Sequence, residues 1–164
     1  MNPSPSPVSA KPDSPGVRFI PPWMFYACLV GGVAVELLTR WPVSLLPQPE
    51  GLITGLGVAL AGFAFMGWGH RRFSSLGVNV KTVLPASMLV TEGAYRFSRN
   101  PMYVGFVAIL AGLGLAAGSW PMLLSALPMF YYLNEHVIPR EEKYLGRTFG
   151  EEYKTYCRKV RRWL

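Results

Sequence analysis

The fold class is decided by an uncharged apolar stretch, GLITGLGVALAGFAFMGWG (residues 51–69). Its length suits a helix that crosses a bilayer, which needs about 20 predominantly apolar residues. His70, Arg71 and Arg72 follow it, as basic residues do at the cytoplasmic end of a transmembrane helix. Gly51 and Gly55 have the small-residue spacing that lets a neighbouring helix approach closely. We therefore predict a membrane-spanning, closely packed helix over residues 51–69.

Three further segments have the length and apolar character of transmembrane helices: residues 19–38, 102–117 and 120–138. Pro128 is expected to kink the last of them. The composition agrees, because 51% of the 164 residues are hydrophobic and only 15% are charged, against about 25% in soluble domains. Residues 1–18 are proline-rich and polar, which predicts a disordered leader. The expected fold is an all-α membrane protein, with about four transmembrane helices in a single domain of residues 19–164.

The basic residues indicate how these helices are oriented. If both termini are cytoplasmic, all of the 16 lysines and arginines except Arg40 lie on the cytoplasmic side. This matches the positive-inside rule, so we predict a multi-pass integral membrane protein with both termini in the cytoplasm. The net charge of +7 then favours the anionic lipid bilayer as partner over a nucleic acid. The two cysteines and two histidines lack metal-ligand spacing, so we expect no metal site.

One acid, Glu36, lies inside the first predicted transmembrane helix. Because a charge within the bilayer is costly, Glu36 is a functional candidate. Its position near the end of the helix, within a turn of Arg40, favours an interfacial ion pair instead.

The C-terminal segment predicts an amphipathic helix over residues 139–162. Lysines and arginines face away from its apolar side chains, which recur at helical spacing: Leu145, Phe149, Tyr156 and Val160. Such a helix suits a membrane surface or the face of the polar loop. The basic residues near its end, together with Trp163, predict an interfacial anchor.

A polar loop, residues 73–101, connects the second and third predicted transmembrane helices. The loop ends in Asn100-Pro101, and because proline suits the first turn of a helix, a new helix N-terminus is expected there. Such a terminus at the membrane surface can hold an anionic group. A plain cytoplasmic loop that obeys the charge rule is the alternative.

Two neighbouring acids, Glu141 and Glu142, open the C-terminal helix. Acids in a first turn are favoured by the helix dipole, which is a sufficient reason for their presence. Alternatively, one of them faces the loop that contains Arg96 and Arg99. Composition does not decide between these interpretations.

Two motifs carry a resemblance to a known family. The first is LVTEGAYRFSRNPMYVG (residues 89–105), and the second combines EEKYL (residues 141–145) with FGEEY (residues 149–153). In type, order and separation they resemble the signature of the isoprenylcysteine carboxyl methyltransferase and phospholipid methyltransferase family. The members of this family are integral membrane enzymes that use S-adenosylmethionine. The resemblance covers about residues 70–162.

The resemblance implies a set of cofactor contacts and candidate reactive groups. Glu141 would pair with the ammonium group of S-adenosylmethionine, and apolar and tyrosine side chains would cover its adenine. The implied cofactor-binding residues are Ser87, Met88, Leu89, Val90, Tyr95, Asn100, Pro101, Met102, Tyr103 and Glu141. Beside these contacts, Arg99 and Glu142 are the candidate catalytic residues and Arg140 is the candidate substrate-binding residue. An amine acceptor would first have to lose a proton, for which Glu142 or His136 could serve as base.

The chain departs from the family pattern at two positions. Many members have histidine at the place of Asn100, and an asparagine cannot shuttle a proton near neutral pH, so this position is interpreted as cofactor-binding. The prenylcysteine enzymes have an arginine at the place of Val137. Arg140 is the nearest cation that could replace it.

The predicted function is therefore S-adenosylmethionine-dependent methyl transfer at the cytoplasmic face, to a lipophilic acceptor such as an isoprenylcysteine-like carboxylate or a related small lipid. One alternative is N-methylation of a phospholipid amine. Another is a membrane reductase that uses NADPH, because the sterol-reductase group looks similar in its C-terminal helices. The acidic pair favours a cofactor with an ammonium group. A non-catalytic membrane scaffold is the remaining alternative.

Overall fold

The computed structural model describes residues 20–39, 46–47, 49–75 and 88–164, and its regular elements in this part of the chain are all helical. The expectation of an all-α fold is confirmed for these residues. The predicted leader, Arg40 and Ser87 lie outside them. The elements are α1 (Pro21–Thr39), α2 (Glu50–Ser75), the short 3₁₀ helix η1 (Gly93–Arg96), α3 (Pro101–Ala116), α4 (Trp120–Leu124), α5 (Ala126–Tyr132), the π-helix η2 (Leu133–Val137) and α6 (Ile138–Lys159).

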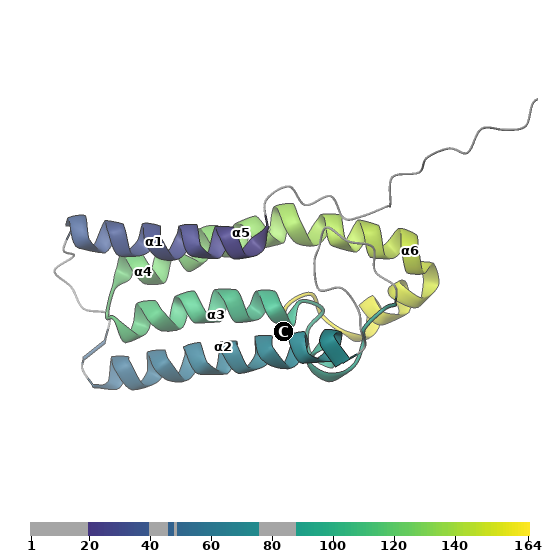
Figure 1. The fold of residues 1–164 in the computed structure, drawn as a ribbon, viewed down its shortest axis with the longest axis horizontal. Helices are drawn as coiled ribbons and strands as arrows, with labels where there is room; N and C mark the ends of the chain where they lie inside the picture. Colours follow the sequence, from purple (N-terminus) through teal and green to yellow (C-terminus); the bar gives the residue numbers. More distant parts are fainter. Residues whose placement is uncertain (1–19, 40–45, 48, 76–87) are drawn as a thin grey trace, which may run out of the picture.

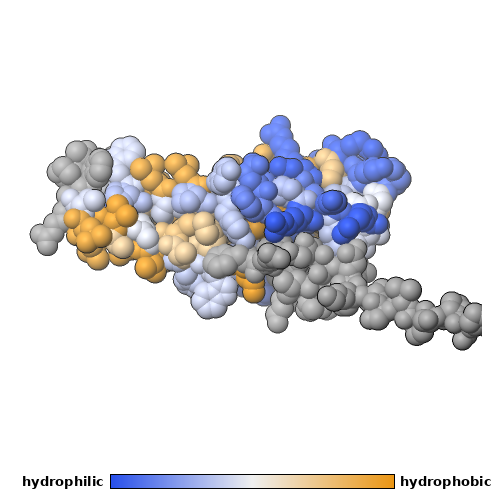
Figure 2. All heavy atoms as spheres, turned by 90° about the horizontal axis from the view of Figure 1, so that it is seen from above, coloured by the Kyte–Doolittle hydropathy of each residue, from blue (hydrophilic) through white to orange (hydrophobic). Residues whose placement is uncertain are grey.

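Helix α3 lies between α2 on one side and α1 with the α4–α5 rod on the other, and α6 projects from one end of this bundle (Figure 1). Two helices are long and apolar enough to cross a bilayer: α1 and the Glu50–Arg72 part of α2. Only 11% and 17% of the residues in their apolar windows are buried, whereas the core helix of a soluble protein is mostly buried. The apolar helix α3 is shorter, with 16 residues. Figure 2 shows apolar side chains over the bundle and hydrophilic ones gathered at the α6 end.

Glycines bring α2 and α3 into close contact. A Cβ atom added at Gly55 would lie 2.2 Å from the Ala116 backbone nitrogen, and one at Gly112 would lie 2.5 Å from the Ala59 nitrogen. Each helix therefore presents a bare backbone to the other, as small residues do in membrane helix pairs. The predicted close packing through Gly55 agrees with this geometry.

The segment predicted as one helix over residues 120–138 is divided into three. Helix α4 ends at Leu124, whose carbonyl would normally bond the N–H group that Pro128 lacks. Pro139 likewise has no N–H group to donate to the Glu135 carbonyl. The Ile138 N–H donates to the Leu133 carbonyl, five residues earlier in the chain. The result is the π-helix η2, a departure that is frequent at functional sites.

Two other boundaries differ from the predictions. Helix α2 continues to Ser75, so the polar loop begins later than residue 73. The predicted single helix over residues 139–162 is wrong, because Gly150 breaks α6 with φ 53° and ψ −120°. Glycine reaches positive φ without the steric cost that a Cβ atom adds. The second part of α6 therefore turns back, and the C-terminus lies beside the start of α3 (Figure 1).

Glu36 lies at the opposite end of the bundle from α6. The Ser119 hydroxyl donates to its carboxylate at 2.6 Å. Glu36 therefore has a polar partner in Ser119, the residue that caps the start of α4. Whether Glu36 also pairs with Arg40, as predicted, falls outside the described residues.

Candidate cofactor site

The site is built around a contact between the two sequence motifs. Pro101 begins α3 after Asn100, whose carbonyl accepts the Tyr103 N–H at 3.0 Å. Tyr103 is only 6% exposed, and its hydroxyl donates to Glu141 Oε1 at 2.6 Å. Glu141 lies in the first turn of α6, 38 residues further along the chain. Of the two acids that open α6, Glu141 is thus the one that reaches the start of α3.

The carboxyl group of Glu141 has a strongly perturbed pKa. The pKa of this carboxyl is raised to about 7, chiefly by burial and also by the charge of the adjacent Glu142. The hydrogen bond from Tyr103 acts in the opposite direction, because it stabilises the carboxylate. A carboxyl group with a perturbed pKa in a partly buried position is a recognised mark of a functional site.

Several buried tyrosines lie in η1 and α6, and Tyr95 is close enough to interact with Glu141. Tyr156 donates its hydroxyl to the Tyr95 carbonyl at 2.8 Å, which holds the end of α6 against η1. The pKa of Tyr95 is raised well above its usual value, chiefly by burial and further by Tyr156 and Glu141. Tyr144 and Tyr153, both from α6, are also buried. The rings of Tyr153 and Tyr156 lie against each other with centroids 6.3 Å apart.

The segment before η1 supplies the remaining predicted cofactor contacts. Val90 is buried, Leu89 is partly buried and Met88 is exposed. Gly93 has a positive φ of 64°, and a Cβ atom there would lie 3.3 Å from the Trp68 ring nitrogen of α2. An ion pair between Arg72 and Glu92 joins the same two segments. The loop is therefore held against α2.

The two candidate catalytic residues lie together in an ion-pair network. Arg99 contacts Glu142 at 3.0 Å, and Arg162 binds the same carboxylate through two nitrogens, at 3.1 and 2.6 Å. The Arg99 side chain also donates to the Cys157 sulfur at 2.8 Å. A carboxylate engaged by two guanidinium groups is well placed to hold these segments together.

The other candidates are placed differently. The Asn100 amide donates to the Arg162 carbonyl at 2.9 Å. Arg140 and His136 are exposed, and Met102 lies with Pro101 against Gly69 of α2.

The sequence did not reveal the role of Arg162, because the basic C-terminal residues were interpreted as a membrane anchor. No signal in the sequence reveals this role, because it depends on the break at Gly150 that turns the chain back.

The described residues fit S-adenosylmethionine in two respects. Glu141 offers a partly buried carboxylate that could pair with the ammonium group. Within the residues described by the structure, the Arg99 Nε atom is buried without a hydrogen-bond partner, so it is a candidate donor to the carboxylate of the ligand. An unpaired buried donor is unfavourable unless a ligand or water satisfies it.

The comparisons with known proteins define the class. The phospholipid methyltransferase family matches residues 51–152, which is more than half of the chain. The chain therefore belongs to this family, as the two motifs predicted. The match runs from the start of α2 into the second part of α6, and so includes the Tyr103–Glu141 contact.

Individual relatives agree with this assignment. The chain is 36% identical over 74 residues to a protein-S-isoprenylcysteine O-methyltransferase of Schizosaccharomyces pombe, which is 44% of this chain and 31% of the relative. A protein-S-isoprenylcysteine O-methyltransferase B of Arabidopsis thaliana is 34% identical over 44% of this chain and 36% of its own length. An uncharacterised Haemophilus influenzae protein matches over its whole length, with 40% identity over 63 residues. The chain thus spans about a third of the named methyltransferases. No solved structure matches it.

Proposed function

We propose that this protein is a membrane methyltransferase that uses S-adenosylmethionine. The contact between Tyr103 and Glu141 carries the proposal, because it joins the two motifs around a carboxyl group that can pair with the ammonium of the cofactor. The names of the relatives support the same chemistry. When bound, the cofactor supplies an electrophilic methyl group for in-line transfer to a nucleophile.

The residues of the chain would bind and orient the cofactor. Glu141 holds the ammonium group, while Tyr95, Tyr103 and Val90 cover the adenine. The backbone N–H groups at the start of α3 and the Arg99 Nε atom would donate hydrogen bonds to the cofactor carboxylate. Ser87, Met88 and Leu89 remain predicted contacts from the segment before η1, as do Asn100, Pro101 and Met102 at the start of α3. Positioning and the exclusion of water then account for much of the rate.

We further propose that the bundle crosses the membrane four times, with the α6 end in the cytoplasm. The third crossing would be α3, and the fourth would be the rod formed by α4, α5 and η2. Large apolar side chains that are exposed on α1 and α2, such as Val30, Leu37, Ile53 and Phe63, would then face lipid. The hydrophilic surface over α6 would lie at the membrane interface (Figure 2).

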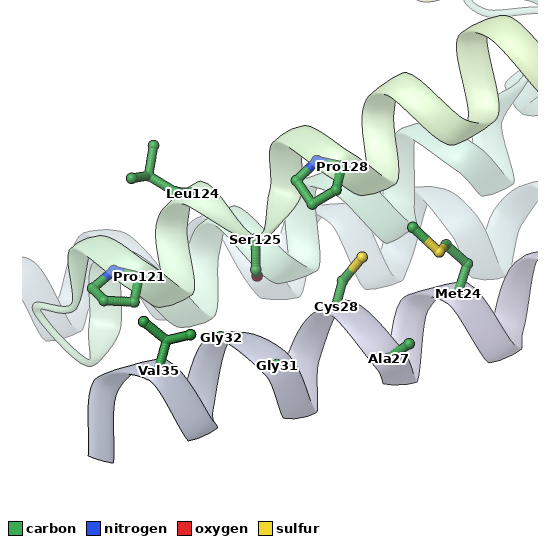
Figure 3. A pocket seen from close by; sticks show the side chains of 10 residues that line it. All are labelled: Met24, Ala27, Cys28, Gly31, Gly32, Val35, Pro121, Leu124, Ser125 and Pro128. Carbon is green, nitrogen blue, oxygen red and sulfur yellow. The ribbon is translucent and has the colours of Figure 1, made fainter. Parts of the chain in front are cut away.

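The acceptor is proposed to be lipophilic, because an apolar groove opens in the bundle (Figure 3). It lies between α1 and the α4–α5 rod and has a volume of about 510 Å³. Its lining runs along α1 from Met24 to Val35, and Pro121 and Pro128 line the facing side. Met24 also packs against the core cluster that contains Tyr103 and Val137. A hydrocarbon chain in this groove would therefore extend toward the Tyr103–Glu141 pair.

Filling the groove should impair the use of the acceptor while leaving the cofactor site intact. Gly31 lines the groove and a Cβ atom there meets nothing within 4 Å, so Gly31→Leu is a substitution that adds a side chain at the groove without straining the backbone contacts of α1. We expect at least a fivefold rise in KM for an S-isoprenylcysteine or a lipid extract, with roughly unchanged affinity for S-adenosylmethionine, since an excluded apolar group costs about 1–3 kcal/mol. Transfer of a labelled methyl group to these acceptors measures the effect.

Gly57→Leu is the matched control, because its Cβ position on α2 is equally open and lies outside the groove. Equal KM values for the two variants would show that the groove does not hold the acceptor.

The function itself is tested by titrating detergent-purified protein with S-adenosylmethionine, its demethylated product and NADPH in a calorimeter. We expect saturable binding of the first two and no binding of NADPH. Transfer of labelled methyl from the cofactor to an S-isoprenylcysteine or to phosphatidylethanolamine would then distinguish a carboxylate from an amine acceptor. Binding of NADPH alone would favour the reductase, and binding of no ligand by folded protein would favour a scaffold.

A further inference from the structure

The last five residues of the chain fold back onto the candidate cofactor site. The Arg161 carbonyl accepts the Arg99 N–H at 2.9 Å, and the Arg162 carbonyl accepts the Asn100 amide at the same distance. The Ser98 hydroxyl, which is fully buried, also reaches the Arg162 carbonyl at 3.4 Å. The final residues of the loop therefore pair with the backbone of the C-terminal tail, defined here as residues 160–164.

The side chain of Arg162 binds the other half of the site. Its guanidinium group makes a two-nitrogen contact with Glu142, the residue next to Glu141. Its backbone carbonyl meanwhile holds Asn100, whose own carbonyl accepts the N–H of Tyr103. One residue thus joins the start of α3 to the start of α6. These are the two segments that bring Tyr103 and Glu141 into contact.

Trp163 attaches the tail to a third element. Its ring nitrogen donates to the Asn134 side chain at 3.1 Å, and its ring packs on Phe130 with centroids 4.7 Å apart. Asn134 belongs to the π-helix η2, which leads directly into α6. The tail therefore fixes the direction in which α6 leaves the bundle as well as its contact with the loop.

From these contacts we infer that the C-terminal tail is a clasp, in which Arg162 and Trp163 are positioning residues that hold Tyr103 against Glu141 in the cofactor-binding geometry. This role rests on the proposed function, and nothing in the tail needs to touch the cofactor. The break at Gly150 makes it possible, because it turns the second part of α6 back toward the loop. Without the tail, Ser98, Arg99 and Asn100 would each lose a hydrogen-bond partner.

The first test compares Arg162→Ala with Arg158→Ala in the full-length, detergent-purified protein. Arg158 carries the same charge in the same region, but it is exposed and its side chain donates to Thr155 on its own helix. We expect Arg162→Ala to weaken binding of S-adenosylmethionine about tenfold, the size of one lost charge-assisted contact. Arg158→Ala should bind like the wild type. Arg162→Lys should recover only part of the affinity, because a lysine cannot make the two-nitrogen contact.

A pH series separates positioning from a general loss of stability. The groups that face Glu141 are Tyr103 from α3, Tyr95 from the loop and the adjacent Glu142. If the clasp holds Tyr103 in place, its loss weakens the hydrogen bond that favours the carboxylate, and the pH midpoint of cofactor binding moves upward in Arg162→Ala. Wild-type affinity and midpoint in this variant would overturn the inference.

Hydrogen exchange tests the clasp without any cofactor. The amide of Arg99 should exchange at least tenfold faster in Arg162→Ala than in Arg158→Ala, since its acceptor lies in the released tail. If Arg162→Ala does not fold, Trp163→Phe replaces it, because phenylalanine keeps a ring but cannot donate to Asn134. Unchanged exchange in the folded variant would refute the clasp. If the wild type itself binds no S-adenosylmethionine, the proposed function fails, while the exchange rates still decide whether the tail holds the loop.

Discussion

Replacement of Glu141 by glutamine is expected to weaken the binding of S-adenosylmethionine by about 10- to 100-fold. The carboxylate would pair with the ammonium group of the cofactor, and a hydrogen bond to a charged group contributes about 1.5–3 kcal/mol. Glutamine has nearly the same shape, and its oxygen can still accept the Tyr103 hydroxyl. The variant should therefore remain folded, and calorimetric titration measures the loss of affinity directly.

The same carboxyl should make cofactor binding depend on pH. Because its pKa is raised to about 7, most of the protein carries a neutral Glu141 at pH 5.5 and about half carries the anion at pH 7. Only the anion pairs with the ammonium group, so affinity is expected to rise roughly tenfold from pH 5.5 to pH 7, in proportion to the competent fraction. The amino group of the ligand stays protonated over this range, since α-amino groups titrate near pH 8.

Two variants serve as controls for this expectation. Glu152→Gln removes an exposed acid from the same helix and should bind like the wild type. Glu141→Gln should lose the pH dependence together with the affinity. A flat profile in the wild type, or an unchanged slope in Glu141→Gln, would remove Glu141 from the cofactor site.

Replacement of Gly112 by alanine is expected to destabilise the protein by about 2–3 kcal/mol, although glycine-to-alanine changes usually stabilise a helix by up to about 1 kcal/mol. The added Cβ atom would lie 2.5 Å from the Ala59 nitrogen and 2.6 Å from the Gly55 carbonyl oxygen. Both are backbone atoms that cannot rotate away, so α2 and α3 must separate. The loss corresponds to a fall in melting temperature of roughly 5–10 °C.

Gly57→Ala on α2 is the matched control, since its Cβ position meets nothing within 4 Å. It should leave the melting temperature unchanged or raise it slightly. Thermal unfolding of both variants in detergent provides the comparison. A melting temperature of Gly112→Ala at or above that of the wild type would show that α2 and α3 do not pack through these glycines.

Several features follow from the order of residue types along the chain. Apolar segments of sufficient length predicted the helices α1, α2 and α3, because local hydrophobicity and helix length are properties of the sequence itself. Pro101 predicted the start of α3 for the same local reason, since a proline restricts its own backbone and that of Asn100. The two motifs were sufficient to identify the family, which the match over residues 51–152 confirms.

The relation between the motifs depends on the tertiary structure. The sequence places Glu141 and Glu142 side by side and leaves open which of them faces the loop. The structure directs Glu141 to Tyr103 and Glu142 to Arg99 and Arg162. This direction depends on the rotation of α6 about its axis, and the π-helix before Pro139 alters that rotation. No periodicity in the sequence reveals such a change.

The helical class, the glycine-rich face of α2 and the family can be predicted from the sequence, because each depends on neighbouring residues or on short motifs. Only the tertiary structure decided that the basic tail contacts the loop at Asn100 through Arg162. The reversal depends on a positive φ at Gly150, and a glycine within a helical pattern is compatible with either a continuous or a broken helix. The broken helix is stabilised by the burial of Tyr153 and Tyr156 and by the ion pair between Arg162 and Glu142.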